Sequence, residues 1–307
     1  MSNHELSRVS GMNTVRLEGA INLDCMTSSH VVGIGVGGAA GLYENLVRSG
    51  LGKLTVVDFD TVDASNLCTQ GFYINDIGIP KVEALGRRLT GINPNLEYVA
   101  VSSDFTKLSE EEVKNLIHNA NLIMLMTDSF YAQARGNRVA LKYQIPAIFA
   151  IVYANARCAE ITFTIPGITP ACHRCAVSSR YQAYKTGYTN DITSTGSTVF
   201  HTHYLNSCLG LLTLAMLHQN LPNTEFSNWF GERCERNLVQ VRMHPQYGRQ
   251  EGSLFEKTFR GQQRIFTFDS LWQFIEPEYP PKYEKCPDCG GIGDLRMVRL
   301  DATDTIY

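Results

Sequence analysis

Residues 30–38, HVVGIGVGG, decide the fold of this chain, because an apolar run passes there directly into a glycine-rich turn. Gly33, Gly35 and Gly38 have the GxGxxG spacing, which lets the backbone come close to a phosphate at a helix N-terminus. The apolar residues are expected to form a core strand, and residues 39–49 the helix that follows. Strand, turn and helix in this order predict a Rossmann-like nucleotide-binding unit. The candidate nucleotide-binding glycines are Gly33, Gly35, Gly37 and Gly38.

A second apolar strand, residues 53–57, delivers an acidic and polar segment at its carboxyl end. Asp58 follows the third glycine at roughly the twenty-residue distance expected of a ribose-binding carboxylate. The usual meaning of this arrangement is a nicotinamide or flavin dehydrogenase. Residues 58–70, however, are dense in carboxylates, amides and hydroxyls, with Asp60 and Asp63 close behind Asp58. Such a segment suits a triphosphate and a metal better than the apolar walls that a nicotinamide needs.

Two further side chains are placed for phosphate chemistry. Lys81 follows Pro80 at an expected helix start, from which its ammonium can reach the same pocket. Asp128 follows the apolar strand expected over residues 121–127, and the carboxyl ends of parallel strands form the edge where such folds bind ligands. Lysine for phosphate charge and aspartate for magnesium are the parts that nucleotidyl or phosphoryl transfer requires.

Two CxxC pairs, Cys172 with Cys175 and Cys286 with Cys289, supply four thiolates, a set typical of structural zinc. They lie about 110 residues apart, more than in a compact zinc ribbon, so the metal would tie a mid-chain segment to the C-terminal region. A redox CxxC pair is the alternative. Two pairs, one of them followed by Gly-Gly, favour zinc.

These features together resemble the ThiF/MoeB/HesA superfamily, which includes the adenylating enzymes of sulfur-carrier pathways and the ubiquitin-activating enzymes. The resemblance runs from about Arg8 to Gly290, nearly the whole chain. It implies a homodimeric adenylyltransferase that uses ATP and magnesium to activate the C-terminal carboxylate of a ubiquitin-like or sulfur-carrier protein, or of a peptide. The stretches that carry it are Gly33 to Gly38, Asp58-Phe59-Asp60, Ser65-Asn66-Leu67, Pro80-Lys81, Asp128 and the two CxxC pairs.

The resemblance also implies roles. Asp58 is the ribose ligand, Lys81 contacts the triphosphate and Asp128 binds magnesium. Asn66 belongs to the motif that lines the phosphates, and Asp60 stands at the same acidic strand end. The zinc ligands are Cys172, Cys175, Cys286 and Cys289.

One position departs from the family pattern. The family usually reads Asn-Leu-x-Arg-Gln after the second strand, and Thr69 stands here in place of the phosphate-gripping arginine. A threonine can hydrogen-bond to phosphate but brings no charge, and charge-assisted bonds are about twice as strong. We therefore expect slow turnover or a cation supplied from elsewhere. The family sends an N-terminal arginine into the partner subunit's site, and Arg8 is placed for that role; Arg16 is a second candidate, and an ordinary solvated arm residue is the alternative for both.

A second departure is the lack of a cysteine between the first CxxC pair and the following apolar helix, where relatives that transfer the acyl group to sulfur often carry one. Three possibilities stay open. The enzyme stops at the adenylate, or a hydroxyl of Ser194, Thr195 or Ser197 accepts the acyl group, or another cysteine serves. Cys234 has cationic neighbours that would favour its thiolate. A structural role is nevertheless expected for every cysteine outside the two CxxC pairs: Cys25, Cys68, Cys158, Cys208 and Cys234.

Composition agrees with a protein of a reducing, cytoplasmic compartment: 307 residues include nine cysteines, and no signal-like N-terminus or apolar stretch of membrane-spanning length is apparent. The formal net charge of −3 leaves no electrostatic footprint for nucleic acid, which counts against a tRNA-modifying relative. His201 and His203 stand at the start of an apolar helix, where they either contact a substrate tail or serve as capping and packing residues. The histidines expected at the surface are His4, His118, His218 and His244.

The alternation of strands and helices predicts a mostly parallel sheet with helices on both faces. Residues 158–165 alternate with period two and are expected to extend the sheet in the antiparallel sense. We divide the chain into an N-terminal arm (1–25), a nucleotide-binding half (26–165) and a half with the crossover loop, dimer helix and zinc site (166–307). Ser109 with Glu112 predicts a helix capping box. Further expected elements are helices over 80–92, 130–143 and 204–218, strands over 96–101, 147–152, 238–243 and 264–268, and a mobile loop over 166–203.

The sequence thus predicts an ATP-dependent adenylyltransferase acting on a ubiquitin-like, sulfur-carrier or peptide C-terminus, with ATP, magnesium and zinc as cofactors. A conjugating enzyme or a sulfurtransferase is a conceivable further partner, and no membrane is involved. The rivals are a catalytically weakened adaptor that only binds a carrier, a tRNA-modifying dehydratase relative, and a conjugation enzyme with a covalent acyl intermediate.

Overall fold

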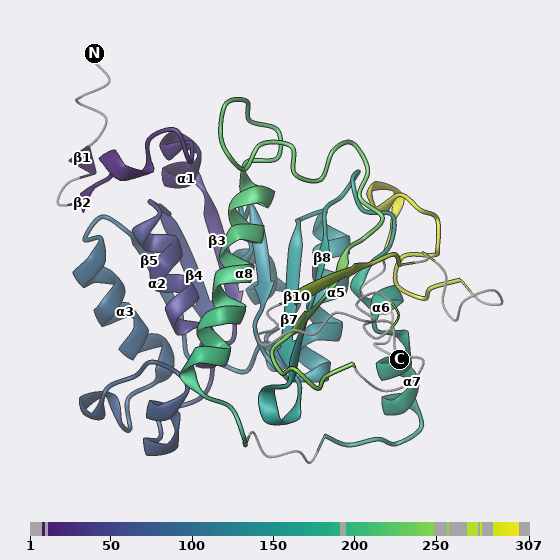
Figure 1. Cartoon of the computed structure of the whole chain (residues 1–307), viewed down its shortest axis with the longest axis horizontal. Coiled ribbons are helices and arrows are strands. Elements are labelled where there is room, and N and C mark those ends of the chain that lie inside the picture. The colour runs from purple at the N-terminus through teal and green to yellow at the C-terminus, as the bar shows by residue number, and fades with distance from the viewer. Residues whose placement is uncertain are drawn as a thin grey trace.

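The structure is a computed structural model that describes residues 8–9, 12–190, 195–248, 257, 269–275, 277 and 285–300. Its central element is an eight-stranded sheet in the order β10-β9-β8-β7-β6-β3-β4-β5 (Figure 1). A separate antiparallel pair, β1 (Arg8–Val9) and β2 (Met12–Asn13), precedes it in the chain.

Five strands form the parallel part of the sheet, and their order places β3 at its centre, between β6 and β4. β3 and β6 are buried at every position, and β4 at every position except its first, as expected of parallel strands that are covered on both faces. Their carboxyl ends therefore meet at one edge, as the sequence predicts. The parallel strands are β3 (His30–Ile34), β4 (Lys53–Val57), β5 (Glu97–Val101), β6 (Leu122–Leu125) and β7 (Ala147–Val152).

Three antiparallel strands continue the sheet beyond β7: β8 (Cys158–Thr164), β9 (Leu238–Arg242) and β10 (Asp269–Gln273). The antiparallel extension expected over 158–165 is confirmed, because β8 returns beside β7 after a turn in which Asn155 has a positive φ of 60°. β9 confirms the strand expected over 238–243. The strand expected over 264–268 lies outside the described residues.

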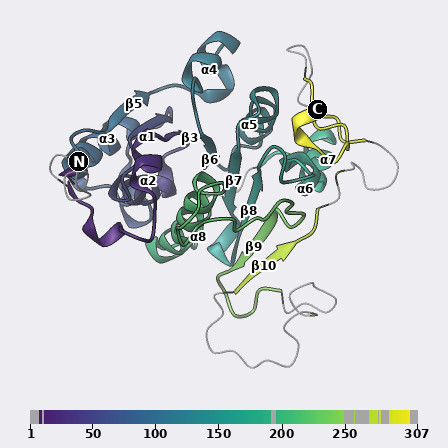
Figure 2. The same cartoon turned by 90° about the horizontal axis from the view of Figure 1, so that it is seen from above.

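Helices cover both faces of the sheet. α2 (Ala40–Arg48), α3 (Lys81–Ile92) and α8 (Val199–Leu217) share one hydrophobic cluster with Val31 of β3. The neighbouring Val32 points to the other face, where it packs with α4 (Glu110–Leu116) and α5 (Phe130–Tyr143). Figure 2 shows the two groups of helices on opposite sides of the sheet. The predicted three-layer α/β architecture is therefore confirmed.

Capping side chains fix where several helices begin. The Ser109–Glu112 capping box at the start of α4 is confirmed, and the Ser129 hydroxyl accepts the Ala132 amide at the start of α5. At α8, the Thr198 amide donates to His201 Nδ1 over 3.0 Å. Of the two roles considered for His201, the structure therefore supports capping.

The segment 166–203 is not a loop throughout, contrary to the expectation. It contains α6 (His173–Ala176) and α7 (Ser178–Lys185), and α8 begins at Val199 rather than near residue 204. α7 packs through Tyr181 against the start of α5, which explains why this polar-looking segment is helical. The short α1 (Leu23–Ser28) precedes β3. Among the described residues, no helix combines the length and the apolar character needed to cross a bilayer.

Candidate functional site

At two of its glycines, the loop after β3 packs closely against neighbouring protein atoms. Gly35 has φ +96°, and a Cβ there would stand 2.4 Å from the Met126 carbonyl oxygen. A Cβ on Gly33 would stand 2.3 Å from the Tyr43 hydroxyl, which donates to the Gly35 carbonyl over 2.8 Å. Gly37 is different, because a Cβ there would meet nothing closer than 3.8 Å. Only Gly37 among these three therefore has free space beside it for a ligand.

Asp58, at the end of β4, is tied to the glycine loop. Its Oδ2 accepts the Val36 amide over 2.7 Å, and its Oδ1 accepts the Asp60 amide over 2.9 Å. Each carboxylate oxygen keeps a further lone pair for a ligand hydroxyl. The structure thus brings Asp58 to the loop as the sequence predicts, and adds a role that the spacing did not reveal: the carboxylate holds the loop in place.

Lys81 and Asp60 form an ion pair of 2.8 Å between Nζ and Oδ2. The Lys81 side chain is buried and the Asp60 side chain is about half exposed. A second link joins the Lys81 amide to the Asp60 carbonyl over 2.9 Å. The ammonium predicted to reach a triphosphate is therefore held beside a carboxylate at the surface, and its charge is partly neutralised.

Asn66 and Thr69 lie in the 3-10 turn Ala64–Cys68 and at its end. The Asn66 side-chain oxygen accepts the Asp63 amide over 3.0 Å, so this amide closes its own turn. The Thr69 carbonyl accepts the Thr202 hydroxyl of α8 over 3.0 Å. Asn206, one helical turn further along α8, donates to the Gly38 carbonyl over 2.8 Å. Helix α8 therefore fastens both the glycine loop and the turn that carries Thr69.

Asp128 follows β6 and lines an open pocket of about 390 Å³ at the carboxyl edge of the sheet. Within the described part of the chain its carboxylate makes no hydrogen bond or ion pair. Gln133 also lines the pocket, and its side-chain amide donates to the carbonyls of Thr127 and Ala150 over 2.8 and 3.2 Å. Of the predicted nucleotide-binding residues, Gly38, Thr69 and Asp128 line this pocket. An unpaired carboxylate at this position is available to a cation.

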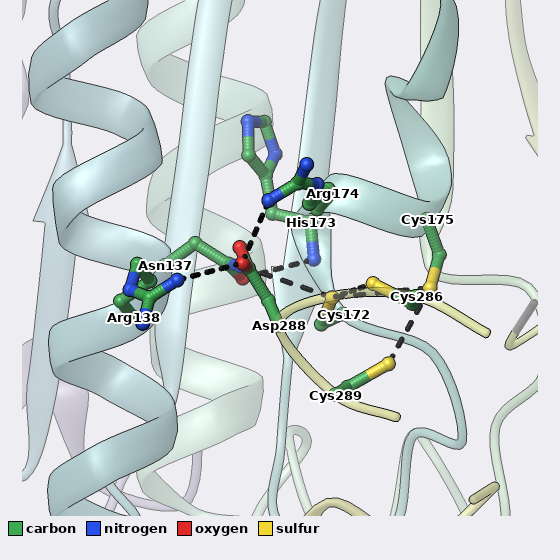
Figure 3. Close-up of polar contacts among 9 residues, drawn as sticks. All are labelled: Asn137, Arg138, Cys172, His173, Arg174, Cys175, Cys286, Asp288 and Cys289. Carbon is green, nitrogen blue, oxygen red and sulfur yellow. Dashed lines mark hydrogen bonds and ion pairs between the residues drawn. The ribbon is translucent and has the colours of Figure 1, made fainter. Parts of the chain in front are cut away.

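The four predicted metal ligands meet in one buried cluster. The sulfur atoms of Cys172, Cys175, Cys286 and Cys289 all lie within 4.8 Å of one another (Figure 3). The separations of three pairs are 3.5, 3.7 and 3.8 Å. A zinc ion with Zn–S bonds of about 2.3 Å in tetrahedral geometry puts its sulfurs about 3.8 Å apart. The donor set and its spacing therefore fit zinc, and a disulfide, at about 2.05 Å between sulfurs, does not describe them.

Residues 11–246 match the family described as the ThiF family. The chain belongs to the ThiF family. It is 33% identical over 147 residues to the sulfur carrier protein ThiS adenylyltransferase of Bacillus subtilis. That match covers 47% of this chain and 42% of the Bacillus subtilis protein. It is 32% identical over 157 residues to the molybdopterin-synthase adenylyltransferase of Escherichia coli, covering 50% of this chain and 60% of that protein.

The match thus spans about half the length of these curated relatives. Among solved structures, E. coli MccB resembles the chain with a TM-score of 0.57 at 14% identity, covering 92% of this chain and 69% of that one. At that identity the likeness concerns the fold alone. Family membership and fold therefore agree with the resemblance that the sequence motifs indicate.

In this ThiF-family chain a buried aspartate joins the second cysteine pair to the rest of the fold. Asp288 accepts hydrogen bonds from Arg174 Nη1 over 2.9 Å, Arg138 Nη1 over 3.2 Å and Asn137 Nδ2 over 2.8 Å (Figure 3). Arg174 comes from the first CxxC pair, whereas Arg138 and Asn137 come from α5. The two cysteine pairs are therefore linked by charge as well as by their shared cluster. Sequence reasoning missed this link, although an Asp and an Arg inside the CxxC pairs were visible.

Other predicted site residues fall in three groups. Arg8 lies in β1, but its side chain is outside the described residues, as is Ser194. Thr195 and Ser197 do line the pocket beside Asp128. Arg16 is exposed. Their proposed roles remain predictions.

The structure disfavours one alternative that the sequence left open and corrects one expectation. Burial raises the pKa of the Cys234 thiol, which outweighs the cationic neighbour Arg236, so a reactive thiolate is not favoured there. His218 was expected at the surface but is fully buried, because its Nε2 accepts the Asn22 amide over 3.0 Å and its Nδ1 lies 2.8 Å from the Leu214 carbonyl. The burial of His218 could not be predicted, because the residues next to it in the sequence do not indicate whether its side chain is buried.

Proposed function

We propose that the protein uses ATP to adenylate the C-terminal carboxylate of a ubiquitin-like or sulfur-carrier protein, or of a peptide. The observation that carries the proposal is the Asp128 carboxylate, which has no hydrogen-bond or ion-pair partner among the described residues and stands in an open pocket beside the glycine loop of a ThiF-family chain. In the reaction, a substrate carboxylate oxygen attacks the α-phosphorus in line. The bond from that phosphorus to the bridging oxygen breaks, and pyrophosphate leaves.

The chain's own residues have separate tasks in this proposal. Asp58 orients the ribose through its remaining lone pairs, and Asn66 and the amides of Gly37 and Gly38 face the phosphates. Asp128 would hold Mg²⁺, which supplies positive charge to the leaving pyrophosphate. Lys81 would contact the triphosphate, and its ammonium is kept in position by Asp60 until a phosphate oxygen competes for it.

Because Thr69 stands where the family has an arginine, the triphosphate lacks one positive charge that another part of the protein must supply. We assign that role to an arginine of the N-terminal arm (1–25), Arg8 or else Arg16, delivered across a homodimer. Helix α8 offers a surface for such a dimer, because its second half is mostly apolar and the helix leaves Leu211 50% and Phe200 79% exposed. In this scheme residues 26–165 bind the nucleotide and residues 166–307 hold the carrier.

The cysteine cluster is proposed to bind zinc in a structural role. All four sulfurs are buried and face one another, which leaves no open position for a substrate. The metal would hold the C-terminal CxxC pair against α6 and so support the carrier-binding half.

The proposal is tested by pyrophosphate–ATP exchange with purified protein and sulfur-carrier proteins or peptides as substrates. Exchange should require the carrier, and Asp128→Ala should reduce it by at least a hundredfold. Asp24→Ala, which removes an exposed carboxylate in α1, is the matched control and should leave exchange unchanged. Equal exchange in the wild type and Asp128→Ala would remove Asp128 from the mechanism.

A second candidate is a weakened adaptor that binds a carrier without adenylating it. Two observations favour it: Thr69 brings no charge, and Lys81 is already paired with Asp60. Calorimetry separates the two candidates, because an adenylating enzyme should bind ATP with magnesium-dependent heat and an adaptor should give none.

A further inference from the structure

Helix α8 belongs to the second half of the chain, yet one of its side chains holds the glycine loop. The helix lies beside α2, which follows that loop (Figure 2). Asn206 of α8 is only 5% exposed, and its Nδ2 donates to the Gly38 carbonyl over 2.8 Å. The two residues are 168 positions apart in the sequence. This bond therefore joins the loop to a part of the chain that the nucleotide-binding motifs do not include.

The packing at this point is close. A Cβ on Gly38 would stand 3.2 Å from Thr202 Cγ2, and a Cβ on Gly41 would stand 3.6 Å from Asn206 Nδ2. The Thr202 hydroxyl has a single proton, and it lies 2.8 Å from the carbonyl of Val199 in its own helix and 3.0 Å from that of Thr69. Thr202 therefore contributes mainly contact, whereas Asn206 makes a directed bond to the loop.

Every carbonyl group of the loop from residue 35 to residue 38 has a hydrogen-bond donor. Three of these donors come from the loop itself or from α2, which follows it directly. The fourth is Asn206, which comes from another element of the fold. The pairs are Gly35 with the Tyr43 hydroxyl at 2.8 Å, Val36 with the Ala39 amide at 2.7 Å, Gly37 with the Ala40 amide, and Gly38 with Asn206.

The amides of the loop divide into two groups. The Gly35 amide donates to the Val57 carbonyl over 2.8 Å, and the Val36 amide donates to Asp58. Among the described residues, the amides of Gly37 and Gly38 make no hydrogen bond. They are the first amides of a helical turn, which have no partner within the helix. These two amides are therefore the donors that the loop can offer to a phosphate.

Two glycines in succession give these amides orientational freedom that a phosphate site has to restrict. Glycine loses more conformational freedom on ordering than any other residue. Because Asn206 fixes the carbonyl of Gly38, it limits the rotation of the backbone that carries both free amides. A restraint present before the ligand arrives lowers the entropy cost of binding. The bond to Asn206 should therefore favour the binding of phosphate groups in particular.

We propose that Asn206 is a positioning residue for the nucleotide: it holds the Gly37 and Gly38 amides ready for the phosphates of ATP. It acts through the loop, since it does not line the Asp128 pocket. The inference rests on the nucleotide site of the function proposed above. It implies that loss of Asn206 weakens ligands that carry phosphates and spares adenosine, which keeps the ribose contact to Asp58 but has no phosphate.

The experiment compares the affinities of ATP with magnesium, by calorimetry, and of adenosine, by displacement. Asn206→Leu keeps a similar volume and removes the donor. One net hydrogen bond corresponds to about a three- to tenfold change in an equilibrium constant, so Kd for ATP should rise by that factor. Kd for adenosine should stay at the wild-type value. In pyrophosphate–ATP exchange, KM for ATP should rise by the same factor, while kcat and KM for the carrier stay near the wild type.

Thr213→Val is the matched control. Thr213 is also fully buried in α8, and its hydroxyl has no hydrogen-bond partner among the described residues. The substitution keeps the shape and removes no bond, so both affinities should equal those of the wild type. A second variant, Asn206→Ser, is too short to reach the Gly38 carbonyl and keeps a polar group in place. It should show the same selective loss, and it decides the question if Asn206→Leu does not fold.

Hydrogen exchange without nucleotide tests the restraint directly. The amides of residues 36–42 should exchange faster in both Asn206 variants than in the wild type, while those of α5 keep their rates. Equal losses of affinity for ATP and adenosine would show that Asn206 only supports the fold, and would overturn the inference. Unchanged ATP affinity would overturn it as well.

The outcomes also separate this inference from adenylation. A wild-type protein that binds ATP but exchanges no pyrophosphate with any carrier loses the proposed activity, and the comparison of ATP with adenosine still decides the role of Asn206. A wild-type protein that binds no ATP removes both proposals.

Discussion

Replacing Asp288 by asparagine tests what holds the second cysteine pair in place. The Asp288 side chain is 1% exposed, and it faces Arg174 and Arg138, whose side chains are 5% and 12% exposed. Asparagine keeps the shape and can still accept one bond, but it removes the negative charge that both buried guanidiniums face. Removing one partner of a buried ion pair costs about 3–5 kcal/mol. We expect Asp288→Asn to lower stability by about that amount.

The assay is thermal unfolding of the zinc-saturated protein, with zinc content measured for each variant. At roughly 2 °C per kcal/mol, the lower end for a large domain, the melting temperature should fall by about 6–10 °C. Zinc content should stay at the wild-type value, because all four thiols remain. Asp294→Asn is the matched control: it removes an exposed pair with Arg296 in the same region and should not measurably change the melting temperature.

A double variant separates charge from shape. Burial raises the pKa of Asp288, the nearby Cys286 adds to this rise, and Arg174 and Arg138 oppose it. Asp288→Asn/Arg174→Met should lose less stability than the sum of the two single variants, since both changes act on the same buried ion pair. A melting temperature of Asp288→Asn within error of the wild type would refute the reasoning.

Three further predictions concern the loop, the metal and pH. Gly35→Ala should destabilise the protein by at least about 1–2 kcal/mol, because alanine is strained at φ +96° and its Cβ would meet the Met126 carbonyl. Gly37→Ala is the control, and its melting temperature without nucleotide should stay near that of the wild type. An equal loss of stability in the two variants would contradict this reasoning. Chelation should lower the melting temperature, because the cysteine cluster joins distant segments; superimposable curves with and without chelator would argue against zinc. Burial lowers the pKa of His30, so its contribution to stability is present above the unfolded value of about 6.5 and is lost as pH falls below it. His30→Gln should therefore flatten the dependence of melting temperature on pH between about 7.5 and 5, and an unchanged slope would exclude His30 as its source.

Much of the fold could be predicted because its features are local. The strand at residues 147–152 and the helix at 130–143 have the expected bounds, since apolar runs and a capping serine act over a few residues. The capping box of α4 follows from the same short-range chemistry. The loop predicted over residues 166–203 was wrong, because α6 and α7 are stabilised by contacts with α5, which lies far away in sequence.

The residue types of the candidate site could be predicted from the sequence, but the contacts between them could not. The residue types and spacing of the glycine turn, Asp58, Asp128 and the two CxxC pairs were sufficient to indicate nucleotide and metal chemistry. Their contacts were not predictable: Asp60 neutralises Lys81, and Glu160 holds Arg180. Such pairs depend on side chains from different strands and helices, so no periodicity in the chain reveals them.

By itself, the sequence determined that a strand would end in a glycine turn, that carboxylates would gather at the same sheet edge, and that four thiols would be available for one metal. These properties follow from backbone sterics and from the chemistry of each residue. Tertiary structure alone decided that Arg180, from a segment expected to be a loop, would line the Asp128 pocket and pair with Glu160 of β8. The reason is that burial and charge balance are set by packing between elements, and packing is decided only when the whole chain has folded.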